Sequence, residues 1–237
     1  MTHVDLNLLA LDTSTDQLSV AVQRADGQRF AHTGAGGAQA SASLIPAVQA
    51  LLAQAGLSLS DLRAIAFGRG PGSFTGLRTA CSVAQGLAWG AGVPVLPIDT
   101  LLAVAEAARS AHGATHVLAL LDARMNEVYA AEYAWRDAAG WRPLSNIAVL
   151  APEAVPTPGA GAVLAGNAFA AYADRLPAAL QALPRIAALP SADALLNLAP
   201  ALLAAGAAVP AEQALPLYIR DKVAQTTAER SAAGLAR

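Results

Sequence analysis

Short apolar runs alternate along this chain with longer segments in which apolar residues recur at helical spacing. The runs predict strands at residues 6–11, 18–22, 29–32, 64–67, 93–96, 117–121 and 127–133, and a strand and turn at 163–167. The intervening segments predict helices over residues 41–55, 75–90, 100–111 and 191–205, and Pro200 is expected to kink or divide the last one. Strands that alternate with helices in this way indicate an α/β fold.

The opening of the chain is echoed about halfway along it. A buried strand ends at Asp12 and is followed by a polar turn and a second strand. The same series recurs at Asp122, which lies 122 − 12 = 110 positions later. The echo is consistent with an internal duplication and predicts two similar lobes, residues 1–108 and residues 109–237. Beyond Thr226 the sequence is polar and unpatterned, so we expect this tail to fray.

A glycine-rich loop at residues 68–78 joins the predicted strand at 64–67 to the predicted helix at 75–90. Four glycines within nine residues allow positive φ angles and close approach of the backbone to another group. Thr75 is the predicted N-cap, and backbone donors that converge on a helix N-terminus favour an anion. A tight turn without a ligand explains the same pattern. The candidate contacts are Gly68, Gly70, Pro71, Gly72, Ser73, Thr75 and Gly76.

Several well-known phosphate and catalytic motifs do not match. Leu77 follows Gly76 where a Walker A loop requires lysine, and Ser73 occupies the last glycine position of a dinucleotide fingerprint. Neither Ser14 nor Ser73 has a histidine at any motif spacing, so a nucleophilic triad has no support.

Two pairs of residues leave alternatives open. Asp12 and Asp122 are placed to hold magnesium and phosphate in a cleft between the lobes, but the favoured interpretation is that each caps its own turn. His112 and His116 form an H-x-x-x-H pair, which on a helix would place two imidazoles on one face. Gly113 and the strand that begins near Val117 favour a loop here rather than a metal site.

Composition narrows the class of protein. The 237 residues are 55% hydrophobic and 14% charged, with a net charge of −2, which indicates a globular chain. The arginines are scattered along the sequence, so no cluster of basic residues suited to binding nucleic acid is visible. Cys81 is the only cysteine, and this fits a reducing compartment. The N-terminus does not look like a signal peptide and no apolar stretch is long enough to span a bilayer, so a cytoplasmic protein is expected.

Four segments resemble the TsaB (YeaZ) family in order along nearly the whole chain. They are the glycine loop at 68–78 and residues 11–15, 122–129 and 216–220. The resemblance implies an α/β, actin/Hsp70/sugar-kinase-like fold of two ribonuclease-H-like lobes, each with a mixed sheet flanked by helices. It also implies a role in making threonylcarbamoyladenosine in tRNA as partner of a TsaD-type transferase, with a TsaE-type ATPase and a TsaC-type synthase in the same pathway. tRNA would be met through the complex, and a homodimer is left open when the partner is absent.

The sequence differs from that of the catalytic TsaD-type relatives at their metal-binding motif. A TsaD-type protein carries an Asn-His-Leu-Glu-Gly-His metal motif, and the matching segment here is residues 99–104. Thr100 and Val104 stand at the histidine positions, and neither replaces an imidazole on a transition metal. We therefore expect no metal and no required cofactor. Contact with ATP or ADP is left open at the glycine loop, Asp12 and Asp122.

Two function classes remain. The first is a non-catalytic subunit that binds and activates a TsaD-type transferase; the second is an independent enzyme, either a weak ATPase or a glycoprotease-type metallopeptidase. The missing lysine loop, histidine pair and triad favour the first. For it, the resemblance implies a partner interface on the two helices at 41–55 and 75–90. The expected residues are Leu44, Val48, Leu51, Leu52, Arg78, Val83 and Leu87.

Overall fold

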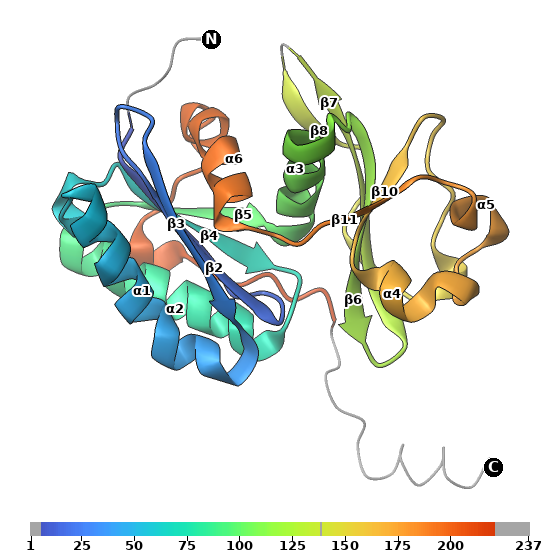
Figure 1. Ribbon diagram of the computed structural model, residues 1–237, viewed down its shortest axis with the longest axis horizontal. Coiled ribbons are helices and arrows are strands. Elements are labelled where there is room, and N and C mark those ends of the chain that lie inside the picture. Colours follow the sequence, from blue (N-terminus) through green and yellow to red (C-terminus); the bar gives the residue numbers. More distant parts are fainter. Residues whose placement is uncertain (1–5, 138, 221–237) are drawn as a thin grey trace, which may run out of the picture.

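Two β-sheets stand side by side in the computed structural model, which describes residues 6–137 and 139–220 (Figure 1). The first sheet has the strand order β3-β2-β1-β4-β5. β1 pairs antiparallel with β2 and parallel with β4, so a three-stranded meander is extended by two parallel strands. The strands are β1 (Leu8–Asp12), β2 (Gln17–Gln23), β3 (Arg29–Ala35), β4 (Ala64–Gly70) and β5 (Val95–Asp99).

The second sheet repeats this topology. Its strand order is β11-β10-β6-β7-β8, with β6 antiparallel to β7 and parallel to β10. β6 therefore corresponds to β1, and Asp122 to Asp12, so the two sheets share the topology expected of two similar lobes. The strands are β6 (His116–Arg124), β7 (Glu127–Arg136), β8 (Gly140–Pro143), β9 (Ala148–Leu150, paired with β7), β10 (Val163–Gly166) and β11 (Arg185–Ala187).

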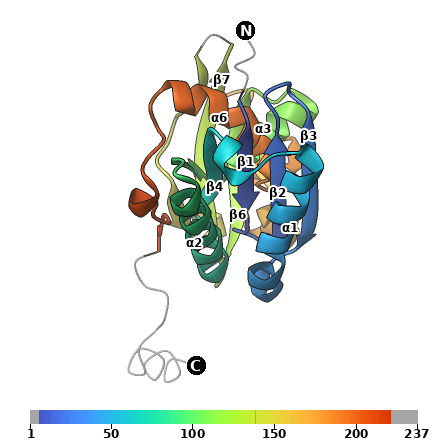
Figure 2. The same cartoon turned by 90° about the vertical axis from the view of Figure 1, so that its left-hand side faces the viewer.

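Helices separate and cover the two sheets, giving the two ribonuclease-H-like lobes of an actin-like fold. α1 (Ala40–Ala55) and α2 (Phe74–Ala91) lie side by side on one face of the first sheet (Figure 2). α3 (Thr100–His112) lies between the sheets, and α6 (Ala192–Ala204) packs beside it on the first. α4 (Ala168–Tyr172) and α5 (Ala178–Gln181) cover the far face of the second sheet. Short 3₁₀ turns occur at Gly37–Gln39, Leu59–Asp61, Pro152–Ala154, Ala173–Arg175 and Ala211–Gln213.

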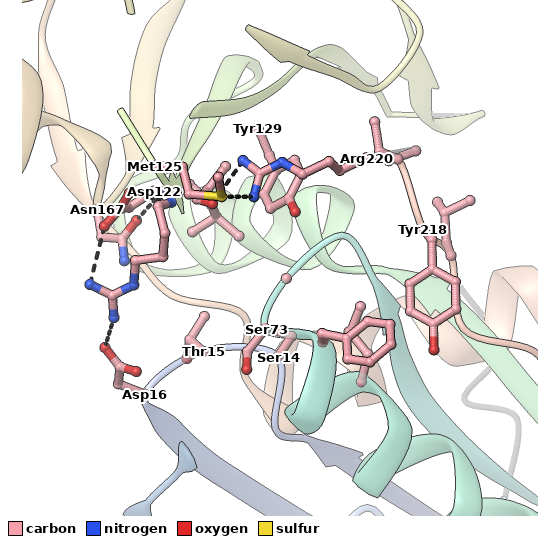
Figure 3. Close-up of a pocket in the computed structure, with 18 residues that line it drawn as sticks. Ser14, Thr15, Asp16, Ser73, Asp122, Met125, Tyr129, Asn167, Tyr218 and Arg220 are labelled. Carbon is pink, nitrogen blue, oxygen red and sulfur yellow. Dashed lines mark hydrogen bonds and ion pairs between the residues drawn. The ribbon is translucent and has the colours of Figure 1, made fainter. Parts of the chain in front are cut away.

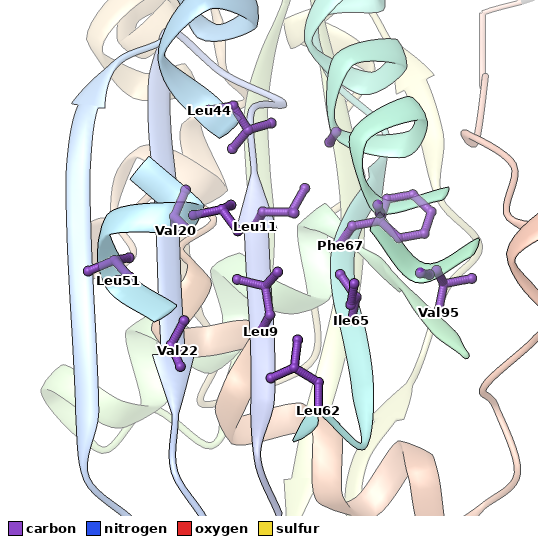
Figure 4. Close-up of a cluster of buried hydrophobic side chains, with 14 of the residues drawn as sticks. Leu9, Leu11, Val20, Val22, Leu44, Leu51, Leu62, Ile65, Phe67 and Val95 are labelled. Atoms are coloured by element: carbon purple, nitrogen blue, oxygen red, sulfur yellow. The ribbon is translucent and has the colours of Figure 1, made fainter. Parts of the chain in front are cut away.

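Strand alternation decides which residues meet which helices. Leu9 and Leu11 of β1 point toward α1 and α2, whereas Leu8 and Ala10 point toward α3 and α6. Figure 4 shows the first of these clusters, in which Leu44 and Leu51 of α1 pack onto the sheet. Burying one leucine side chain in such a core stabilises the fold by about 1.5–3 kcal/mol.

A buried carboxylate joins the two lobes. Glu106 of α3 accepts hydrogen bonds from Arg109 and Ser110 on its own helix, from Trp141 Nε1 on β8 (2.8 Å) and from Asn197 Nδ2 on α6 (3.1 Å). Burial alone would raise the pKa of Glu106, but these donors outweigh it and lower the pKa below its ordinary value. The carboxylate therefore stays charged and holds α3, α6 and β8 together.

Three expectations need correction. Ser73, not Thr75, caps α2, because its hydroxyl oxygen accepts from Gly76 N and the helix begins at Phe74. Pro200 does not divide α6, which runs unbroken. A lobe boundary after residue 108 is wrong for the C-terminal segment, because α6 and Ala211–Gln213 pack on the first sheet.

The tail beyond Thr226 lies outside the described residues. None of the helices in the described ranges is long and apolar enough to cross a membrane.

Candidate functional site

The glycine loop packs against the turn that follows β1, and this packing explains two of its glycines. A Cβ on Gly76 would lie 1.8 Å from the carbonyl oxygen of Thr13, and one on Gly72 would lie 2.5 Å from that of Ser14. The two segments are also hydrogen-bonded: Thr13 Oγ1 donates to Gly76 O at 2.7 Å, and Ser73 N donates to Ser14 O at 2.7 Å. These glycines therefore allow one part of the chain to approach another.

The other side of the loop holds the C-terminal strap, which we define as residues 214–220. Gly70 has φ +125°, and a Cβ there would lie 2.5 Å from Leu217 O. Leu217 N donates to Arg69 O at 2.7 Å, which fixes the strap beside β4. Pro71 O accepts from the buried hydroxyl of Thr100. Thr100 thus ties the loop to α3, and Val104 is fully buried in the layer between the sheets.

Asp12 is sealed beneath the glycine loop. Its side chain has no exposed surface, and Oδ1 accepts from Ser14 N at 2.9 Å and from Ser14 Oγ at 2.7 Å. Oδ2 has no partner among the described residues and lies where a Cβ on Gly68 would be. Burial raises the pKa of Asp12, against the opposing hydrogen bonds from Ser14. Asp12 therefore caps its own turn and does not reach the cleft.

Asp122 also caps its own turn, but at the edge of the cleft. Its Oδ1 accepts from Arg124 N at 2.8 Å and from the Tyr172 hydroxyl at 3.0 Å. Arg124 lies 3.4 Å from Asp122 Oδ2 through Nη1 and crosses the cleft to Asp16 through Nη2, at 2.5 Å. The carboxylate is thus engaged by two neighbours, and its guanidinium partner bridges the two lobes.

A cavity of about 320 Å³ lies between the lobes at this point (Figure 3). Of the nucleotide or anion contacts expected from the sequence, only Gly72, Ser73 and Asp122 line it; Gly68, Gly70, Pro71, Thr75, Gly76 and Asp12 do not. Sequence reasoning missed the contributions of Tyr129 and Asn167. Tyr129 closes the family-like segment at 122–129 and could have been found there, whereas no named motif marks Asn167. Arg220 closes the last family-like segment, and it could have been found there.

Comparisons with known proteins agree over most of the chain. A family model described as "TsaD: tRNA N6-adenosine threonylcarbamoyltransferase" matches residues 32–228. The chain is 39% identical to the tRNA threonylcarbamoyladenosine biosynthesis protein TsaB of Escherichia coli (strain K12), covering 92% of this chain and 96% of that protein. TsaB of Haemophilus influenzae is 36% identical, with coverage of 92% and 95%. YeaZ from Pseudomonas aeruginosa superposes with a TM-score of 0.83 at 42% identity, covering 90% of this chain and 99% of that one.

The chain belongs to the TsaB (YeaZ) family. The TsaB resemblance of the four segments and the expected fold are thereby confirmed. The interface residues inferred from that resemblance, however, have to be compared with their packing in this structure.

On α1, all four expected interface side chains are buried in the chain's own core. Leu44, Val48, Leu51 and Leu52 are 0%, 1%, 3% and 6% exposed. They pack onto the first sheet because they form the inward stripe of an amphipathic helix. As the chain is folded they cannot contact a partner, and a charge placed on them would disrupt the core. On this point the expectation from sequence was wrong.

On α2, the expected residues are divided between the core and the surface. Val83 and Leu87 are partly buried against the first core cluster. Arg78 is exposed, with its guanidinium 3.8 Å from the centre of the Phe74 ring, and its Nε donates to the Tyr218 hydroxyl at 3.1 Å. Phe74 and Tyr218 also contact each other, with ring centroids 5.1 Å apart. Arg78 therefore fastens the strap to the start of α2.

His112 and His116, the predicted H-x-x-x-H pair, lie on different elements and have different surroundings. His112 ends α3 and is exposed, whereas His116 begins β6. His116 Nε2 is 2.7 Å from Glu132 Oε1, and its Nδ1 is 3.2 Å from Ala160 O. Within the described ranges no three His, Cys, Asp or Glu side chains gather as a metal site would require.

Proposed function

We propose that this chain is the non-catalytic subunit that binds and activates a TsaD-type transferase as threonylcarbamoyladenosine is made in tRNA. Its relatives in Escherichia coli and Haemophilus influenzae are named as tRNA threonylcarbamoyladenosine biosynthesis proteins. The family model that it matches is described as the transferase itself, which supports descent from a common fold. A shared fold does not carry chemistry by itself, so the argument rests on individual residues.

The surroundings of the acidic residues support a non-catalytic role. A metal-dependent phosphoryl or peptidase reaction needs carboxylates or imidazoles with free lone pairs in the cleft. Asp12 is sealed beneath Gly68, and Asp122 is held by Arg124 and Tyr172. These contacts disfavour the alternative of an independent ATPase or metallopeptidase.

The observation that carries the partner role is the outward face of α2. Gly86 and Gly90 lie there one turn apart, and a Cβ on either would meet nothing within 4 Å. Glycine inside a helix destabilises it by roughly 0.5–1 kcal/mol relative to alanine. Packing within the described residues does not require these glycines, whereas a partner backbone at close range would. Trp89, beside them, is 72% exposed and offers an apolar anchor.

The corrected interface therefore uses the outward positions of α1 and α2. α1 lies beside α2 on the same face of the first sheet (Figure 2). Its exposed positions include Ala42, Gln49, Ala50 and Ala53. A stable interface buries on the order of 1,600 Å² in total, with an apolar centre and a polar rim.

Gly86→Arg tests the interface without disturbing the core. The new side chain has open space and replaces a poor helix former, so the fold should be retained. The matched control is Ala201→Arg, which introduces the same arginine side chain at an exposed position of α6, on the opposite face of the sheet. Circular dichroism should show both variants folded.

Gly86→Arg should lose binding to the TsaD-type protein, because a buried unpaired charge costs several kcal/mol. In cells that lack the parent chain, it should also fail to restore threonylcarbamoyladenosine in tRNA, whereas Ala201→Arg should restore it. Equal binding and equal restoration by both variants would show that α2 is not the interface.

The remaining partners follow from the same proposal. A TsaE-type ATPase and a TsaC-type synthase would act in the same pathway, and tRNA would be met through the complex. We place the chain in the cytoplasm, where tRNA modification requires it. A homodimer through the same helices is the alternative occupant when the TsaD-type partner is absent.

A further inference from the structure

The cavity between the lobes contains a hydroxyl without a partner. Tyr129 of β7 is only 7% exposed, and no group in the described residues hydrogen-bonds to its hydroxyl. Figure 3 shows that this hydroxyl points into the cavity. The hydroxyl is open to the cavity, since Asp12 Oδ2 is the one side-chain oxygen or nitrogen in the described ranges that is both fully buried and unpaired. A ligand in the cavity can therefore pair with it. Burial raises the pKa of Tyr129, so the hydroxyl remains a neutral donor.

The opposite wall supplies further donors from the first lobe. Gly72 and Phe74 line the cavity at the start of α2, and neither backbone N–H has an acceptor within the described ranges. α2 has 18 residues, so its N-terminus carries the full positive end of the helix dipole. The Ser73 cap is long, at 3.5 Å to Gly76 N, and leaves that end incompletely neutralised.

The second lobe adds a side-chain amide. Asn167 Oδ1 accepts from Asp122 N at 2.9 Å, which fixes the amide and leaves Nδ2 without an acceptor among the described residues. Residues with unpaired donors therefore line the cavity from both lobes. Of the carboxylates that line it, Asp122 is engaged by Arg124 and Tyr172, and Oδ2 of Asp16 is engaged by Arg124. A ligand that satisfies several donors at once is an anion.

The charged residues limit how much negative charge is accommodated. Arg124 is paired with Asp16 and Asp122, and Arg220 is paired with Glu127. Among the described residues that line the cavity, both guanidinium groups are thus paired, and Asp12 is sealed away from any magnesium ion. The apolar part of the lining includes Leu77, Leu121, Leu217 and Ile219.

We propose that this cavity binds a small organic anion with one carboxylate or phosphate head group. The head lies between the start of α2 and the Tyr129 hydroxyl, and the apolar body lies against Leu77, Leu121 and the strap. The cavity volume of about 320 Å³ suits a ligand of about the size of a substituted benzene ring.

The test is a titration of the full ¹⁵N-labelled chain, followed by NMR, with benzoate and with phenyl phosphate. Benzamide is the uncharged control, and ATP with magnesium is the polyanionic one. Saturable shifts of the Gly72, Phe74 and Asn167 amide signals with either anion are expected, and the tighter probe identifies the preferred head group. Tyr129→Phe should weaken binding about tenfold, as loss of a hydrogen bond to a charged group does.

Tyr133→Phe is the matched control, because Tyr133 is buried on the same strand but does not line this cavity. It should bind both probes as the parent does. The proposal is overturned if neither anion gives saturable shifts up to about 10 mM, a limit that corresponds to very weak binding. It is also overturned if benzamide binds equally well, if Tyr129→Phe binds like the parent, or if magnesium-ATP binds more tightly and displaces both anions.

Discussion

The turns that follow β1 and β6 hold equivalent places in the two lobes, but their surroundings differ. After β1, Asp12 is fully buried because the glycine loop packs directly over it. After β6, the Asp122 side chain is 16% exposed and lines the cavity, since β10 ends at Gly166 and no loop of this kind covers it. Of the two equivalent aspartates, only Asp122 is therefore accessible from the cleft, and the first turn contributes Asp16 instead.

The backbone conformations of the two turns also differ. Arg124, Met125 and Asn126 have φ values of 60°, 54° and 62°, whereas no described residue from Thr13 to Asp16 has a positive φ. Left-handed conformations are costly for residues other than glycine and concentrate near ligand sites. Of the two turns in equivalent places, one is therefore packed under the glycine loop and the other is open to the cleft.

The largest change in stability is expected from Gly76→Ala, which would disturb the contact between the glycine loop and the turn after β1. The new Cβ would meet the Thr13 carbonyl oxygen at 1.8 Å, and both sides of this contact are backbone. We expect a loss of at least about 3 kcal/mol in the free energy of unfolding. Gly86→Ala makes the same change in the same helix where a Cβ meets nothing, and should add roughly 0.5–1 kcal/mol. Urea unfolding followed by circular dichroism measures both, and coincident transitions would refute the packing account.

A second effect concerns pH. Because burial raises the pKa of Asp12 above its ordinary value of 3.8, the folded chain binds this proton more tightly than the unfolded chain. The stabilisation that results is fully present below the unfolded pKa and is lost as pH rises through the folded pKa. Asp12→Asn should therefore lose less stability than the parent as pH rises above the unfolded pKa. Parallel stability curves would mean that the carboxyl is not sealed as described.

The smallest effect is expected from the ion pair across the cleft. The side chains of Arg124 and Asp16 are 68% and 81% exposed, so solvent screens the pair. A double-mutant cycle of Arg124→Ala and Asp16→Ala should give a coupling energy of at most about 0.5 kcal/mol. A coupling well above about 1 kcal/mol would mean that this ion pair, and not the hydrogen bonds of Glu106, holds the lobes together.

The regular elements were accessible from sequence because they are long or strongly patterned. α1, α2 and α3 were predicted to within two residues at each end, from the spacing of apolar residues. β8, β9 and β11 were missed, since strands of three or four residues carry too little alternation. The return of α6 to the first sheet depends on long-range packing, which local pattern does not encode.

The site was less accessible than the fold. The glycine loop was correctly singled out, but its sequence fits a ligand and an intramolecular contact equally well, and only the positions of Thr13, Ser14 and Leu217 distinguish them. The apolar stripe of α1 was recognised, yet a stripe does not say whether the chain or a partner covers it. Tyr129 ends a family-like segment, but its place in the cavity follows only from the position of the second lobe against α2.

The central claim is that this chain assists a reaction that it does not perform. The most direct measurement is the yield of threonylcarbamoyladenosine in tRNA, with purified components and threonylcarbamoyl-adenylate supplied. A TsaD-type transferase and a TsaE-type ATPase would be assayed with this chain, without it, and with the chain alone. The account predicts no product from the chain alone and a rate at least about fivefold higher when it joins the other two. Product from the chain alone, or an equal rate in its absence, would contradict the account.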